Sequence, residues 1–274
     1  WPRLDDVSGE VVIDRASLRV LADHAAIVTG PGQQVVLRDI DALIANLRHS
    51  PVLEVSGHTE GEGTAYMAFL QGSPLDGLLQ HAFSEASAGG QGRLPLFLST
   101  PLTRASDTQV RGTIHIDNGR LQIDPTLPAF EQLDGQIVFD EQNVALEGLT
   151  ARFLGGDVQL SGGAGPGHDA LVMTGQLSAD ALRTLIDAPG MQRFAGEAAY
   201  TARLTGVGQS EANPTLSITS DLEGMALDFP APLAKAAKDR WPLRAVWAYR
   251  GQTGRVLEVA LRDSMRARLV RHSD

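Results

Sequence analysis

Apolar and polar residues alternate in short runs along most of this chain. In the run from Gly112 to Asp117, the apolar residues Ile114 and Ile116 are each followed by one polar residue. Successive side chains of a β-strand point to opposite faces, so this spacing predicts a strand with one buried and one exposed face. Comparable runs return about every 8 to 12 residues with turn residues between them, which favours an antiparallel meander.

Three segments of this pattern carry a local prediction. Asp-Asn-Gly at 117–119 stands between two alternating runs, and it predicts a hairpin turn because Asn and Gly tolerate positive φ. Residues 39–48 fit either a helix or an edge strand. Residues 57–63 place one His and two Glu among glycines, which predicts a solvated turn rather than a metal site.

Few segments contain the residues that usually mark the start or the end of a helix. The Ser-Pro pair at 73–74 precedes an amphipathic stretch and supplies an N-cap and a first helical residue, which predicts a helix near 74–84. Ser178 precedes a similar stretch and predicts a helix near 179–187. A third short helix is expected over 232–239.

The two halves of the chain resemble each other. Residues 7–14 align with residues 133–140, which lie 126 positions later, and the alignment continues without a gap into the next apolar run. This internal similarity predicts two strand-rich repeat units, 1–129 and 130–274, that form one continuous elongated domain.

The segment 222–243 interrupts the strand pattern. Two prolines remove two backbone donors and end the strand, and an amphipathic stretch follows. We expect this proline-braced elbow, 229–243, to plug a groove or cap a sheet edge, with a purely structural corner as the alternative. The candidate residues for this role are Phe229, Pro230, Pro232, Leu233 and Trp241.

Composition and charge exclude several classes of protein. Hydrophobic residues make up 43% and charged residues 20%, a balance typical of folded proteins. The formal net charge of −10 argues against nucleic acid as a partner. Cysteine is absent, which excludes disulfides and thiol chemistry. The chain begins at Trp1 and not at a methionine, so we expect it to be a segment of a longer protein. It contains no apolar run of the roughly 20 residues that a membrane-spanning helix needs.

The sequence contains no recognisable set of catalytic residues. Seven histidines are scattered without metal-ligand spacing, and the glycine-rich segments match no phosphate-binding motif. No nucleophile motif or cofactor cradle is found either. We therefore expect a binding, carrying or scaffolding protein with no cofactor and no metal, rather than an enzyme.

The order of these elements resembles the YhdP family of AsmA-like proteins from Gram-negative bacteria. The resemblance covers roughly residues 1–262, and the proline-braced elbow is its most specific part. The segments that carry it are Trp1-Pro2, Ser73-Pro74-Leu75, the run from Leu94 to Leu102, the run from Phe130 to Phe139, Leu154-Gly155-Gly156, the run from Leu222 to Lys235, and Trp241-Pro242-Leu243.

The resemblance implies a mainly β fold, an elongated, curled antiparallel sheet (a taco-like β-groove) with two or three short helices. It also implies a periplasmic location, with the parent protein anchored in the inner membrane by a helix that this chain lacks. Members of the family resemble bridge-like proteins that carry phospholipid toward the outer membrane in an apolar groove. The expected partners are phospholipid acyl chains, the inner membrane and other envelope proteins.

Strand period then selects the residues that line such a surface. We expect one shared apolar surface or, as the alternative, packing in a closed core. These candidates are Val11, Ile13, Ile114, Ile116, Leu121, Ile123, Ile137, Phe139, Val144 and Leu146. The closed core corresponds to a second hypothesis, a structural or interaction module for envelope assembly. A hydrolase acting on glycans or lipids is the third hypothesis, and clustered carboxylates with shifted pKa values in one cleft would support it.

Overall fold

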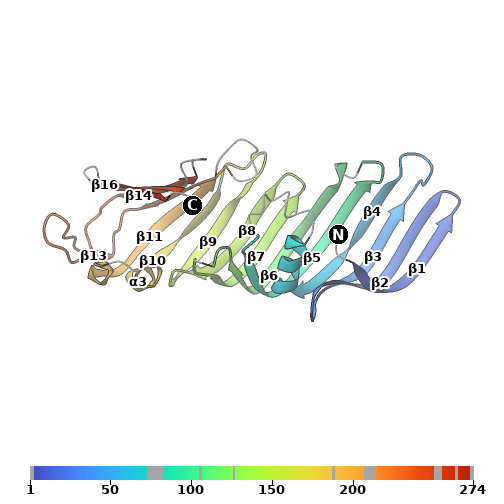
Figure 1. The fold of residues 1–274 in the computed structure, drawn as a ribbon, viewed down its shortest axis with the longest axis horizontal. Helices are drawn as coiled ribbons and strands as arrows, with labels where there is room; N and C mark the ends of the chain where they lie inside the picture. Colours follow the sequence, from blue (N-terminus) through green and yellow to red (C-terminus); the bar gives the residue numbers. More distant parts are fainter. Residues whose placement is uncertain are drawn as a thin grey trace. The chain divides into compact units, whose positions relative to one another are not determined.

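The computed structural model describes residues 3–72, 83–104, 107–125, 127–186, 189–206, 214–249, 255–262 and 265–271. The protein is mainly β, with 65% of its residues in strands, and its 16-stranded antiparallel sheet does not close into a barrel. Two α-helices and one 3-10 helix complete the described elements (Figure 1). The predicted fold class is confirmed.

The strands follow one another in the sheet almost in chain order. β13 alone leaves this path, and it pairs with the start of β11. The strands are β1 (Leu4–Asp14), β2 (Ser17–Gly30), β3 (Gln33–Ile44), β4 (Val52–Glu62), β5 (Ser87–Pro101), β6 (Gln109–Gln122), β7 (Phe130–Asp140), β8 (Val144–Phe153), β9 (Gly156–Ala164), β10 (Leu171–Ser178), β11 (Phe194–Thr205), β12 (Thr215–Ser220), β13 (Met225–Leu227), β14 (Leu243–Tyr249), β15 (Arg255–Leu261) and β16 (Met265–Arg271). The helices are α1 (Gly63–Gln71), α3 (Ala179–Leu185) and the 3-10 helix η2 (Met191–Arg193).

The chain divides into two compact units, Trp1–Glu147 and Gly148–Asp274, with the division inside β8. This division reflects which residues contact one another, and it does not test the sequence repeat. The repeat units 1–129 and 130–274 therefore stay a prediction. The internal similarity extends to the backbone, because Asp6 and Gln132 both have φ near +50° and both lie at a register shift of their strand.

Residues 39–44 continue β3, which pairs with strands on both sides and is not an edge strand. The predicted hairpin at 117–119 is wrong, because β6 continues through this segment. Asn118 adopts φ +47° there and forms a bulge, and its backbone N–H donates to the Asp134 carboxylate at 2.8 Å. Asn and Gly suit positive φ in a bulge as well as in a turn, so the composition did not distinguish the two.

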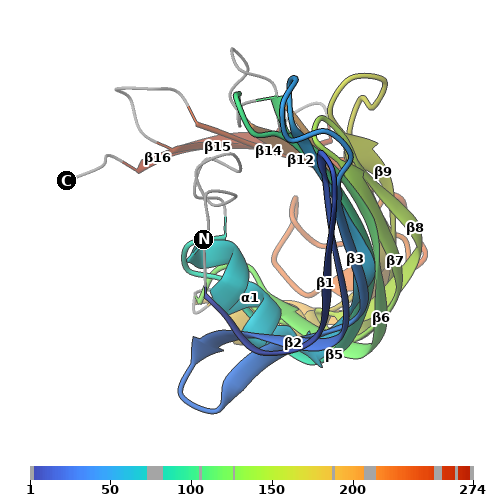
Figure 2. The ribbon, with the colours of Figure 1, turned by 90° about the vertical axis from the view of Figure 1, so that its right-hand side faces the viewer.

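The predicted turn at 57–63 is also wrong, because β4 continues to Glu62 and α1 follows at once. No side chain caps the start of this helix, so tertiary packing holds it. The Tyr66 ring lies close to Gly92, and its hydroxyl lies 2.8 Å from the Thr59 hydroxyl. In the first unit, α1 lies on the concave side of the sheet (Figure 2).

The other helix predictions have different outcomes. α3 begins where expected, and the Ser178 hydroxyl accepts a hydrogen bond from the Ala181 backbone N–H. The predicted helix near 74–84 falls mainly on residues outside the described part of the chain. The predicted helix over 232–239 is wrong, because this segment contains turns and one bridge between Leu227 and Lys235. Pro232 has no backbone N–H to donate to a helix, and Lys235 bridges to Leu227, so the segment forms turns instead.

Candidate functional site

The first unit has one sheet face on which apolar side chains meet from strand to strand. Because side chains alternate, directly opposed residues of neighbouring strands share a face, and these rows are apolar from β1 to β6. We call this surface the first apolar face. One row contains Val11, Val20, Ala42, Val55, Leu98 and Val110, and the next contains Ile13, Leu18, Ile44 and Leu53.

Most of these side chains are neither fully buried nor fully exposed. In the longer row Val11 is exposed and the other five are half-buried. α1 packs over one end of the face, where it contacts β2, β3, β4 and β5. All strands of this unit belong to one sheet, so no second sheet of described strands packs against the face. The first apolar face is therefore an apolar surface that the described residues cover only at one end.

The ten predicted lining residues fall into three groups. Val11 and Ile13 lie on the edge strand β1, with 64% and 70% of their surface exposed. The candidates on β6 and β7 are half-buried, and four of them lie on the first apolar face, where Ile114 opposes Ile137 and Gly112 separates Phe139 from Leu96. The remaining four lie farther along the chain. Leu121 opposes Ala88 and Phe130, and the Asn118 bulge returns it to the face of Ile116. Ile123 lies just beyond β6, and Val144 and Leu146 are half-buried in β8.

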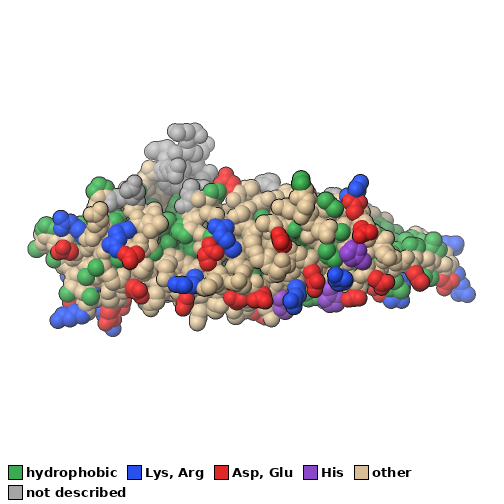
Figure 3. Space-filling view, turned by 90° about the horizontal axis from the view of Figure 1, so that it is seen from below, with side chains coloured by type: hydrophobic (Ala, Val, Ile, Leu, Met, Phe, Trp, Pro, Cys, Tyr) green, Lys and Arg blue, Asp and Glu red, His purple; other side chains and the backbone are tan. Residues whose placement is uncertain are grey.

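The opposite face of the same sheet is polar. Arg19 donates two hydrogen bonds to the Asp41 carboxylate at 2.9 and 2.6 Å, and these hydrogen bonds hold the pKa of Asp41 below its ordinary value. Arg111 lies over the Phe97 ring, 4.4 Å from its centroid. The surface seen in Figure 3 carries interspersed acidic and basic side chains with no continuous patch of one sign. The two faces of the sheet therefore differ in chemistry along several strands.

The second unit repeats this arrangement with larger side chains. Its apolar rows extend from β10 to β16, and we call this surface the second apolar face. In the row that begins at Leu171, Trp247 and Leu269 have 41% and 57% of their surface exposed, and the other four residues are half-buried. The rows contain Leu171, Leu204, Leu216, Trp247, Leu257 and Leu269, and then Met173, Ala202, Ile218, Ala245, Val259 and Ala267.

The sequence analysis missed the second apolar face. None of the ten lining candidates lies beyond residue 146, although the alternation Leu216-Ser217-Ile218 was visible. The short strands β14 to β16 share the period of two, and the register shows that their apolar residues oppose each other. The signal that would have found this face is the same alternation, extended to the end of the chain.

The elbow covers one end of the second apolar face. Leu222, Met225, Leu227 and Trp241 are buried together with Ala198 of β11. Side chains of the sheet pack against this cluster at the end of the rows, among them Leu243, Leu261 and Met265. The peptide bond between Ala231 and Pro232 is cis.

The elbow candidates occupy different environments. Trp241 is buried, with the Arg262 guanidinium 4.9 Å from its ring centroid. Phe229 is half-buried and meets Phe194 edge to face, with 5.8 Å between the ring centroids. The other three candidates, Pro230, Pro232 and Leu233, are exposed.

Lys235 is the least expected residue of the elbow, because its side chain is buried with 3% exposed. Its ammonium donates to the backbone carbonyls of Leu222 and Met225, both at 2.7 Å, and to that of Ala236 at 3.1 Å. Burial lowers the pKa of Lys235, while the carboxylates of the surrounding segment oppose this shift. A buried ammonium that joins the carbonyls of Leu222 and Met225 to that of Ala236 fixes the path of the elbow against the segment before it. The sequence did not indicate this, since Lys235 alternates with small residues as a solvent-facing lysine would.

The second apolar face contains one buried polar atom without a partner. The Tyr200 hydroxyl has no hydrogen-bond partner among the described residues. Burial raises the pKa of Tyr200 to about 12. A buried hydroxyl without a hydrogen-bond partner lowers the stability of the fold. The packing of the Tyr200 ring, and not its hydroxyl, therefore stabilises this position.

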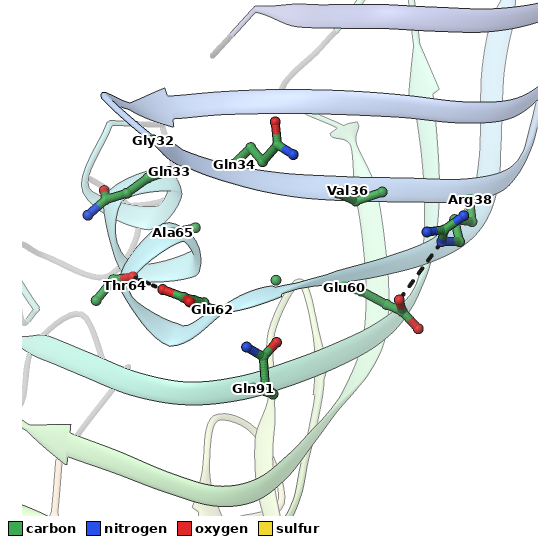
Figure 4. Close-up of a pocket in the computed structure, with 11 residues that line it drawn as sticks. Gly32, Gln33, Gln34, Val36, Arg38, Glu60, Glu62, Thr64, Ala65 and Gln91 are labelled. Carbon is green, nitrogen blue, oxygen red and sulfur yellow. Dashed lines mark hydrogen bonds and ion pairs between the residues drawn. The ribbon is translucent and has the colours of Figure 1, made fainter.

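A separate pocket of about 310 Å³ lies where β4 joins α1 (Figure 4). Its walls are polar, with three glutamines, two glutamates, Arg38 and Thr64. Arg38 pairs with Glu60 at 3.8 Å, and Thr64 donates to Glu62 at 3.4 Å. Such walls suit a small polar molecule and not a hydrocarbon chain. Across the described residues, no group of three or more His, Cys, Asp or Glu is placed to hold a metal ion.

One of the comparisons with known proteins identifies the family of this chain. Searches of curated proteins and of solved structures each returned no significant match. Within the described residues, no helix has the length and apolar character needed to cross a membrane. The family model described as YhdP protein matches residues 1–273, nearly the whole chain. The chain therefore belongs to the YhdP family, as its sequence predicted.

Proposed function

We propose that the two apolar faces bind the acyl chains of phospholipid, and that the chain is a segment of a periplasmic protein that conducts phospholipid toward the outer membrane. The parent protein would be anchored in the inner membrane. In this proposal the chain contributes to outer-membrane homeostasis by providing an apolar path, and it catalyses no reaction.

The observation that carries the proposal is the exposure of the apolar rows. No residue of the row that begins at Val11 or of the row that begins at Leu171 is buried. In a closed core, side chains of this size are usually fully enclosed and contact 6 to 12 other residues, in round numbers. Wide apolar surfaces left accessible on a folded protein mark binding sites.

The energy of lipid transfer explains why such a surface is needed. Exposure of a hydrocarbon chain to water costs about 0.8 kcal/mol per methylene, or on the order of 12 kcal/mol for some fifteen methylenes. An apolar wall several strands wide replaces much of that water. With strands about 4.8 Å apart, six strands span about 24 Å, which exceeds the roughly 20 Å of an extended chain of that length.

Binding of a fluorescent fatty acid tests the proposal, with variants that differ only in the face that they change. Ile137 lies on the first apolar face opposite Ile114, and its neighbour Val138 lies on the other face opposite Thr113. Both side chains are half-buried. We expect Ile137→Asp to weaken binding at least tenfold, because a carboxylate would have to lose its water beside the hydrocarbon.

The matched control is Val138→Asp, which introduces the same charge in the same strand. It should bind the fatty acid as the unchanged protein does. Equal binding by both variants, with both folded, would refute a role for the first apolar face. Absence of binding by the unchanged protein would favour the alternative, a structural module for envelope assembly.

A further inference from the structure

An inserted segment separates two strands that are directly paired. Ser220 at the end of β12 lies opposite Leu243 at the start of β14. A two-residue turn is sufficient to join opposed residues of two antiparallel strands. The chain instead places residues 221–242 between them, and we call these residues the inserted segment. It contains most of the elbow, and the connection of β12 to β14 does not explain its length.

The inserted segment covers one row of the second apolar face. This third row follows the row that begins at Met173. It contains Leu243, Leu261 and Met265, which oppose one another in β14, β15 and β16. All three side chains are half-buried and pack against the buried cluster that includes Trp241. Side chains of the inserted segment therefore lie on this row, where the hydrocarbon of a ligand would otherwise lie.

The first two rows of this face lie outside that cover. Among the described residues, the side chains that pack against the buried cluster include none from the rows that begin at Leu171 and Met173. Trp247 and Leu269, both in the row that begins at Leu171, remain exposed. The cover therefore ends between the second row and the third row.

We propose that the inserted segment is an internal stop, which confines the hydrocarbon of a bound lipid to the first two rows of the second apolar face. This inference rests on the proposed function, since a stop requires a lipid to confine. Neighbouring rows lie about 7 Å apart along a strand, whereas six strands span about 24 Å. An extended hydrocarbon chain of roughly 20 Å therefore fits across the strands and not along them. The stop thus sets the direction in which the lipid lies.

The inserted segment is held too firmly to act as a lid. The Trp241 backbone N–H donates to the Asp221 carbonyl at 2.7 Å. The Gly224 backbone N–H donates to the Ala237 carbonyl at 2.7 Å, so the beginning and the end of the segment are joined. The buried Lys235 ammonium adds its three hydrogen bonds. Segments that open easily have few buried contacts, so we expect the stop to stay in place when lipid binds.

A fatty acid with a nitroxide group on its hydrocarbon chain tests the stop, because the nitroxide quenches the fluorescence of a tryptophan that it contacts. Trp247 lies in an uncovered row and Trp241 in the buried cluster. Trp1→Phe with Trp241→Phe leaves Trp247 as the sole reporter, and Trp1→Phe with Trp247→Phe leaves Trp241. We expect the probe to quench Trp247 more strongly by roughly a factor of four or more, because the close-packed cluster encloses Trp241.

Displacement of a fluorescent fatty acid shows independently whether the nitroxide probe binds. Binding with equal quenching of both tryptophans would overturn the stop and leave lipid binding intact. Binding that quenches neither tryptophan would also overturn the stop, since the hydrocarbon would then avoid the second apolar face. A probe that does not bind at all would refute the proposed function itself, and the stop with it.

Removal of the inserted segment gives a second test. Asn-Gly in place of residues 221–242 joins Ser220 to Leu243 by a two-residue turn. Leu261→Trp then reports on the third row, in chains whose own tryptophans are replaced by phenylalanine. We expect the probe to quench this reporter more strongly by roughly a factor of four or more when the segment is absent, because the row is then uncovered.

The control is Trp247 in the shortened chain, which the probe should quench as it does in the full chain. Circular dichroism establishes that each variant is folded. Equal quenching of the Leu261→Trp reporter with and without the inserted segment would overturn the proposal. If the shortened chain does not fold, the comparison of Trp241 with Trp247 decides.

Discussion

Replacement of Lys235 by methionine tests whether a buried ammonium holds the elbow on the second apolar face. Methionine keeps most of the volume and removes all three hydrogen bonds. Two of the carbonyls retain a donor, since Leu222 O accepts from the Met225 N–H and Ala236 O accepts from the Asp239 N–H. The main loss is the charged hydrogen bond to Met225 O, together with weaker ones to the other two carbonyls.

The magnitude follows from these partners. A hydrogen bond to a charged group contributes about 1.5 to 3 kcal/mol, and the relief of burying the ammonium offsets part of the total. We therefore expect Lys235→Met to lower the free energy of unfolding by about 2 to 3 kcal/mol. Lys238→Met, which changes an exposed lysine of the same segment, should lower it by less than about 0.5 kcal/mol.

Urea denaturation followed by tryptophan fluorescence measures both variants. Trp241 is buried in the cluster that Lys235 supports, and replacement of Trp1 and Trp247 by phenylalanine makes it the sole reporter. A loss for Lys235→Met no larger than that for Lys238→Met would show that the three hydrogen bonds do not hold the elbow, and the argument from burial would fail.

Three further substitutions test separate parts of the fold by urea denaturation at constant m-value. Tyr200→Phe should raise the free energy of unfolding by about 1 kcal/mol, because the lost hydroxyl has no partner among the described residues; a loss of stability would reveal one. Gly92→Ala should lower it by roughly 1 to 3 kcal/mol, because the new Cβ would lie 2.9 Å from the Tyr66 ring; an unchanged midpoint would contradict the position of α1. Ser178→Ala should cost about 1 kcal/mol through the lost N-cap of α3, whereas Ser178→Thr should cost less.

Period-two alternation predicted most of the sheet because strand geometry imposes it directly. The hairpin at 117–119 was wrong for a local reason. Ile116 and Leu121 are five residues apart, an odd spacing that a regular strand would place on opposite faces. The residue inserted at the Asn118 bulge compensates for this spacing within one strand, so no turn is needed.

α1 and the elbow show where local pattern is insufficient. No side chain caps the start of the helix, and apolar residues lie on most of its sides. It forms because its Tyr66 ring packs onto Gly61 and Gly92. Gly61 and Gly92 are far apart in the sequence and meet only when β4 pairs with β5. The local sequence does not contain this contact, so it suggested a turn. In the elbow, the position of Lys235 depends on carbonyls 10 and 13 residues away, which no short-range pattern contains.

Lipid transport requires that phospholipid occupies the apolar faces, and native mass spectrometry of the chain purified from a Gram-negative host without detergent tests this directly. We predict additional peaks whose mass differences equal those of phospholipids, retained in Val138→Asp and diminished in Ile137→Asp. A single peak at the mass of the bare chain, with no phospholipid in an organic extract of the same sample, would contradict the account.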